Sequence, residues 1–60
     1  MDIAIIFSFG DLKLVGLQKK NGSTFKAYYN GVFQEVVSSH ETNLDLASTS
    51  VAEQLMGIVL

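Results

Sequence analysis

Lysine and aromatic side chains are interleaved in the middle of the chain, where the residue types with the clearest chemical potential gather. Every basic residue of the protein lies there, at Lys13, Lys19, Lys20 and Lys26. The aromatic residues of the same stretch are Phe25, Tyr28, Tyr29 and Phe33. Proteins that bind single-stranded nucleic acid combine a basic groove with aromatic side chains on which bases stack. The stretch therefore predicts a binding surface, provided that its lysines and rings share one face.

Ordinary structural roles compete with this interpretation. Lysines at the tip of a hairpin commonly serve solubility, and Lys26 would pair with Glu35 on a neighbouring strand. Tyr28 and Phe33 would equally suit burial between two subunits. Arginine, the residue best suited to bidentate phosphate contacts, is absent, and the formal net charge is −2. Binding of nucleic acid and binding of another protein therefore both stay open.

The sequence offers little for catalysis or for metal binding. His40 is the only histidine, cysteine is absent, and the five glycines do not form a phosphate-binding loop. His40, Glu41 and Asp45 match no standard spacing of metal ligands. We therefore predict a protein that is not an enzyme, with no catalytic residue, no metal and no cofactor.

Three turn signals define the elements that must position the central stretch. Asn21-Gly22 and Asn30-Gly31 are typical of type I′ hairpin turns, which need positive φ at both central residues. Gly10-Asp11 suits a type II′ turn, because glycine comes first. The residues between these turns are rich in strand formers. We expect a four-stranded antiparallel meander with strands at about 3–9, 12–20, 23–29 and 32–37.

Two-residue loops at all three turns predict a definite register. Ile6 would then face Val15, Val15 would face Tyr28, and Tyr28 would face Phe33. Since side chains alternate across a strand, the pairings sort all four strands into two faces. The predicted core face carries Ile3, Ile5, Phe7, Phe9, Leu12, Leu14, Gly16, Phe25, Ala27, Tyr29, Val32 and Val36, interrupted by Gln18 and Gln34. The predicted second face carries Ile6, Ser8, Lys13, Val15, Leu17, Lys19, Thr24, Lys26, Tyr28, Phe33, Glu35 and Val37.

The second face is too apolar for an ordinary solvent-exposed surface, and an apolar stripe of this kind usually marks an interaction site. We expect copies of the chain to associate through Ile6, Val15, Tyr28 and Phe33 into a homodimer or a higher oligomer. We expect a nucleic-acid ligand to bind at Lys13, Lys19, Lys26, Tyr28 and Phe33.

The carboxy-terminal third predicts a loop followed by a helix. Residues 38–48 are polar and are expected to form a loop, with an alternating segment at 42–47 that would also suit a short fifth strand. Ser50 and Glu53 match the capping-box pattern for a helix start. Apolar residues then recur at helical spacing, which predicts a helix at about 50–59 covering the core face of the sheet. The sequence leaves open whether that helix packs on its own sheet or on a neighbour's.

Taken together, the sequence predicts one small α+β domain, residues 1–60, that self-associates. A chain of this length buries only about 60 % of its unfolded surface, so association is a common source of stability. No apolar run approaches the roughly 20 residues of a membrane span, and we expect a cytoplasmic protein without membrane contact. Two functions remain: binding of single-stranded nucleic acid through the lysine and aromatic face, or regulation of a larger protein through that face or a free sheet edge.

Overall fold

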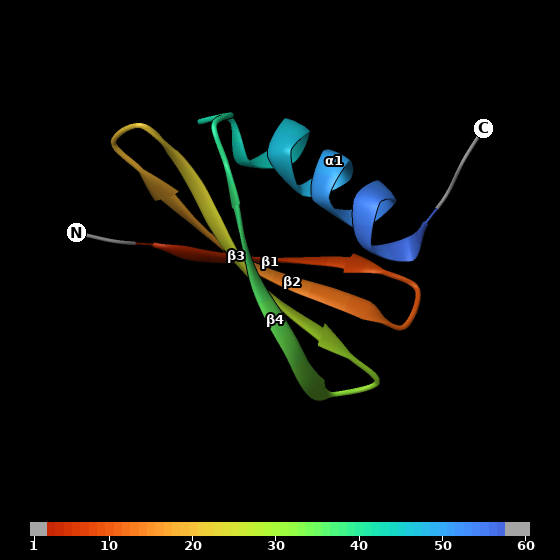
Figure 1. Cartoon of the computed structure of the whole chain (residues 1–60). Coiled ribbons are helices and arrows are strands. Elements are labelled where there is room, and N and C mark those ends of the chain that lie inside the picture. The colour runs from red at the N-terminus through yellow and green to blue at the C-terminus, as the bar shows by residue number, and fades with distance from the viewer. Residues whose placement is uncertain (1–2, 58–60) are drawn as a thin grey trace.

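The computed structural model describes residues 3–57 and has one antiparallel sheet with one helix above it (Figure 1). Its elements are β1 (Ala4–Phe9), β2 (Leu12–Lys19), β3 (Gly22–Tyr29), β4 (Val32–Ser39) and α1 (Leu44–Met56). The strands lie in the order β1-β2-β3-β4, so each strand pairs with its neighbour in the sequence. The predicted α+β fold, a four-stranded meander followed by a carboxy-terminal helix, is confirmed.

The first and third turns form as predicted. Gly10 has φ +63°, and Asn30 and Gly31 have φ +51° and +80°, the positive values that the II′ and I′ turns require. The register of the first hairpin is confirmed, because Ile6 pairs with Val15, and the third hairpin has the predicted pairing of Tyr28 with Phe33 next to its turn.

The second turn differs from the prediction, because its two loop residues are Lys20 and Asn21 rather than Asn21 and Gly22. Gly22 instead belongs to β3 and pairs with Lys19. Its φ is +153°, and a Cβ atom there would overlap the carbonyl oxygen of Ser39. Gly22 is thus required where the start of β3 passes the end of β4, rather than in the turn.

This change moves the β2–β3 register by two residues. Val15 therefore faces Lys26, and Tyr28 faces Lys13, so the predicted pairing of Val15 with Tyr28 is wrong. A shift of one residue would exchange the two sides of a strand, whereas a shift of two preserves them. The predicted faces of β2 and β3 consequently survive the error.

A bulge in β4 exchanges the sides of three residues. The register shifts between the pairs Tyr28–Phe33 and Ala27–Glu35, which leaves Gln34 as the extra residue on β4. Val37 consequently lies opposite Phe25 and packs against the core, whereas Val36 lies opposite Lys26 and is 52 % exposed. The predicted core position of Val36 and the predicted second-face positions of Glu35 and Val37 are therefore wrong.

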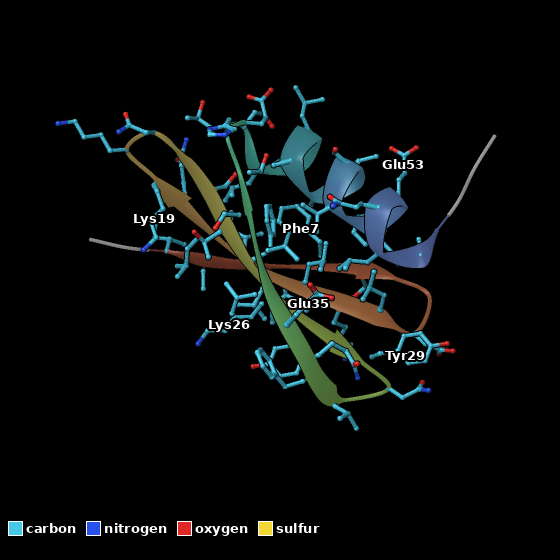
Figure 2. All side chains as sticks on the ribbon, in the orientation of Figure 1. Phe7, Lys19, Lys26, Tyr29, Glu35 and Glu53 are labelled. Carbon is cyan, nitrogen blue, oxygen red and sulfur yellow. The ribbon has the colours of Figure 1, made fainter. Side chains whose placement is uncertain are left out.

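The core lies between the sheet and α1, on the face that the sequence predicts. Its buried hydrophobic residues are Leu12, Leu14, Phe25, Ala27, Ala47, Val51 and Ala52. The ring of Phe25 lies against Gly16, where an added Cβ would approach its Cε2 atom to 2.7 Å, and Phe7 meets the same ring edge-on at 6.3 Å between centroids. Figure 2 shows Phe7 between the sheet and the helix. Other predicted core residues remain exposed at the margins of the sheet, namely Ile3, Ile5, Tyr29 and Val32.

The helix begins six residues earlier than predicted. Asn43 is its N-cap, with its side-chain oxygen accepting from the Leu46 amide at 3.2 Å, so Ser50 lies inside the helix and 42–47 is not a fifth strand. The side of α1 turned to the sheet is formed by residues at helical spacing, Leu44, Ala47, Ser48, Val51, Ala52 and Leu55. Ser48 interrupts this stripe in the sequence, but its buried hydroxyl donates to the Asp45 carbonyl at 2.9 Å. The helix ends at Gly57, with φ +64°, and the predicted residues 58 and 59 lie outside the described part of the chain.

Side-chain hydrogen bonds attach the segment before α1 to the turn end of the second hairpin. The Gln18 amide donates to the Thr42 carbonyl at 2.8 Å, and the buried Ser23 hydroxyl donates to the Glu41 carbonyl. The Glu41 carboxylate accepts a hydrogen bond from the backbone N–H of Asn43 at 3.1 Å. These contacts set the helix start above β2 and β3, and α1 packs on the sheet of its own chain.

The cap at Asn43 provides a direct test of where the helix begins. We expect Asn43→Ala to lower the free energy of unfolding by about 1 kcal/mol, because the Leu46 amide loses its acceptor. Ser50→Ala is the matched control, and we expect it to change stability by less than about 0.5 kcal/mol because Ser50 is exposed within the helix. Urea denaturation of both variants measures the difference. An equal or larger loss for Ser50→Ala would contradict the observed helix start.

Candidate functional site

The sheet face opposite α1 is uncovered within residues 3–57, and we call it the open face. Its side chains alternate along the strands with the buried residues Leu12, Leu14, Phe25 and Ala27. Figure 2 shows Lys26 projecting from this face, away from the helix. The open face is formed by Ala4, Ile6, Ser8, Lys13, Val15, Leu17, Lys19, Thr24, Lys26, Tyr28, Phe33, Val36 and Ser38.

All of the side chains predicted to form a site lie on the open face. They are the binding residues Lys13, Lys19, Lys26, Tyr28 and Phe33 and the interface residues Ile6 and Val15. They come from all four strands, and only the strand alternation brings them together. The structure also adds Val36, which the sequence assigned to the core because the bulge in β4 leaves no local signal.

Cross-strand pairing arranges the open face in rows. One row runs Ser8, Lys13, Tyr28, Phe33, and the next runs Ile6, Val15, Lys26, Val36. Each row therefore contains one lysine with an apolar or aromatic side chain on at least one side. The continuous apolar stripe predicted from the sequence is absent from these rows, because Lys13 and Lys26 interrupt them.

Tyr28 and Phe33 form the aromatic centre of the open face. Their ring centroids are 5.6 Å apart at an interplanar angle of 69°, an edge-to-face arrangement. Phe33 is 49 % exposed, and the Tyr28 side chain is less exposed than that of Phe33. Tyr28 thus supports the Phe33 ring while leaving it accessible to a ligand.

The open face carries lysines without any carboxylate among the residues that the structure describes. The bulge places Glu35 opposite Ala27, on the helix side of the sheet, so the predicted Lys26–Glu35 pair is wrong. Asp45 and Glu53 lie on α1, and Glu41 lies in the segment before it. Figure 2 shows Glu53 on the outer side of the helix. Lys13, Lys19 and Lys26 therefore lie on the open face, whereas Glu35, Asp45 and Glu53 lie on the helix side.

A polar hollow adjoins one end of the open face, at the tip of the second hairpin. Its lining includes Lys19, Lys20, Thr24, Ser38 and His40, together with Gly22. His40 is exposed there, as expected for a residue in a polar segment. The hollow extends the basic surface beyond the ends of the strands.

The described residues meet neither the requirements of a metal site nor those of a membrane-spanning helix. Within 3–57 no group of three or more histidine, aspartate or glutamate side chains could hold a metal ion. In the same range, no helix has both the length and the apolar character needed to cross a membrane. Comparisons with protein families, with characterised proteins and with solved structures find no match to this chain.

Proposed function

We propose that this protein is a small non-enzymatic protein that binds single-stranded nucleic acid through its open face. The observation that carries the proposal is the grouping of Lys13, Lys19 and Lys26 with an exposed aromatic ring on a surface that has no carboxylate among residues 3–57. With Glu35 on the other side of the sheet, no acidic residue in the described part of that face neutralises Lys26.

The two kinds of side chain have separate roles in the proposed complex. The lysines contact phosphates, and Phe33 provides a stacking surface worth about 1–3 kcal/mol for one base. Lys13 and Lys26 both adjoin Tyr28, since Lys13 faces it from β2 and Lys26 is two residues from it along β3. A nucleic-acid strand with one base stacked on Phe33 would therefore have two lysines beside the same aromatic pair.

Fluorescence anisotropy with a labelled oligothymidine at low salt tests the proposal. If three lysines contact phosphates, the logarithm of the affinity should fall with the logarithm of the salt concentration at a slope of about −2. We expect Phe33→Ala to weaken binding by roughly 5- to 150-fold, the equivalent of one lost stacking contact.

Lys20 provides the matched control, because it is the one lysine that belongs to a turn rather than to the open face. We expect Lys13→Gln and Lys26→Gln each to reduce both the affinity and the salt slope, and Lys20→Gln to have the smaller effect. Absence of binding at micromolar protein concentration, or an effect of Lys20→Gln equal to that of Lys26→Gln, would contradict the proposal.

A protein partner is the second candidate, as a small regulator or inhibitor docked on the same face or on a free edge of the sheet. The exposure of Ile6, Phe33 and Val36 favours it, because large apolar side chains dominate protein interfaces. In that case Phe33→Ala should weaken capture of the partner, whereas lysine-to-glutamine changes and added salt should have little effect. We also propose a cytoplasmic location, which cell fractionation tests.

A further inference from the structure

β1 is an edge strand without the features that usually prevent an edge from pairing. Its sequence AIIFSF contains no charge and no proline, and its ladder with β2 runs without a bulge. The other edge strand, β4, carries both a bulge and the charged residue Glu35. Within residues 3–57 no strand lies on the outer side of β1.

The outward backbone groups of β1 can be assigned from its turn. A two-residue hairpin makes Phe9 and Leu12 a hydrogen-bonded pair, and bonded and non-bonded pairs alternate along an antiparallel ladder. Phe7 and Ile5 therefore bond to β2. Ala4, Ile6 and Ser8 direct their N–H and C=O groups away from the sheet.

The side chains on both sides of this edge are exposed and apolar. Ile6 is 65 % exposed on the open face, and Ile5 is 43 % exposed on the helix side; Ile3, which precedes β1, is 67 % exposed. A ligand on one face of the sheet would cover only one of these sets. A strand added beside β1 would cover both sets while bonding the free backbone groups.

We propose that the occupant of this edge is β1 of a second copy of the chain, paired antiparallel about a two-fold axis. A strand without charge meets no like-charge repulsion when it pairs with itself, and a two-fold contact uses the same patch on both copies. The register that pairs every outward residue places Ile6 against Ile6 of the second copy and Ala4 against Ser8. It also places Ile5 beside Phe7 of the second copy on the helix side.

Edge pairing suits this molecule better than contact between two open faces. Stacked open faces would bring Lys13 and Lys26 of both copies together without a carboxylate among the described residues of that face, and burial of unpaired charge is costly. Edge pairing leaves the lysines in solvent. Because paired residues of an antiparallel ladder point to the same side, it also joins the two open faces into one continuous surface.

Sedimentation at micromolar concentration tests the proposal with variants at the two ends of one row. We expect the wild type to have twice the chain mass of 6.5 kDa and Ile6→Glu to have the mass of one chain. Val36→Glu places the same charge at the β4 end of the row that contains Ile6, and we expect it to remain dimeric. A monomeric wild type, a dimeric Ile6→Glu, or a monomeric Val36→Glu would overturn edge pairing.

Amide hydrogen exchange of the wild type provides a test without mutation. In the paired state the Ile6 and Ser8 amides should exchange slowly, as Phe7 does through its bond to β2. Fast exchange at Ile6 and Ser8 beside slow exchange at Phe7, in a sample that sediments as a dimer, would show that the copies meet elsewhere and would overturn the proposal.

Discussion

Replacement of Phe25 by alanine should remove about 3–5 kcal/mol from the free energy of unfolding, the usual cost of emptying a buried aromatic site. The Phe25 side chain is fully buried, and Leu14 is the only other large apolar side chain buried to that extent in the described chain. A domain of 60 residues has a total stability of only about 3–9 kcal/mol, so the loss would leave much of the population unfolded. Urea denaturation followed by circular dichroism, at a single protein concentration, measures it.

Phe33→Ala is the control for this prediction, because it removes the same side chain from the exposed face. Phe33 is 49 % exposed, so we expect a loss well below that of Phe25→Ala. Equal losses for the two variants would contradict the division of the sheet into a packed face and an open face.

Gly22→Ala should lower the free energy of unfolding by about 2–4 kcal/mol, from backbone strain and from overlap with packed atoms. The φ angle of +153° is one that residues with a side chain rarely adopt. The new Cβ would overlap the Ser39 carbonyl oxygen and approach the His40 Cα to 3.2 Å. Relief would require β3 and β4 to separate where Ser23 pairs with Ser39 and where the Ser23 hydroxyl holds the segment before the helix. Thermal and urea denaturation measure the loss.

Gly31→Ala separates the two causes of that loss. Gly31 also has positive φ, +80°, but no atom lies within 4 Å of the Cβ that alanine would add. We expect it to cost about 1–2 kcal/mol, from backbone conformation alone. If Gly31→Ala were as damaging as Gly22→Ala, the close passage of β3 and β4 would not be the reason for glycine at position 22.

The proposed binding face and the proposed edge contact can be occupied at the same time. The open face presents its lysines and Phe33 perpendicular to the sheet, whereas β1 offers its free backbone groups in the plane of the sheet. A dimer through β1 would therefore double the basic surface without covering it. A dimer through the stripe of Ile6, Val15, Tyr28 and Phe33 would instead compete with any ligand of the same face.

The turn signals and the alternation of side chains were sufficient to predict the meander and most of the two faces. Gly10-Asp11 and Asn30-Gly31 encode their turns locally, through backbone angles that few residues adopt. The second turn was misplaced because Asn21-Gly22 satisfies the same local rule, while Gly22 is needed for its contact with Ser39 seventeen positions away (39 − 22 = 17). The predicted faces of β2 and β3 remained correct because the register differed by an even number of residues.

The errors that changed the candidate site came from features without a local signature. Val36 and Val37 are equally suited to a core position, so the sequence could not show which of them the bulge at Gln34 would turn inward. The same bulge moves Glu35 to the helix side of the sheet, which the sequence did not predict. The helix start was misplaced because Ser48 breaks the apolar stripe, although its hydroxyl bonds to the Asp45 carbonyl inside the helix.

The amino-acid sequence alone determined that this chain forms a four-stranded meander with a helix, and that most of its lysines share a side with Tyr28 and Phe33. These properties follow from turn conformation and from the two-residue period of a strand, which are local and repeat along the chain. Only the tertiary structure decided which residues of β2 and β3 stand opposite one another, that Glu35 leaves the lysine side, and that Asn43 begins the helix. Each of these depends on contacts between segments far apart in the sequence, where the packing of Gly22 on Ser39 and of α1 on the sheet outweighs local preference.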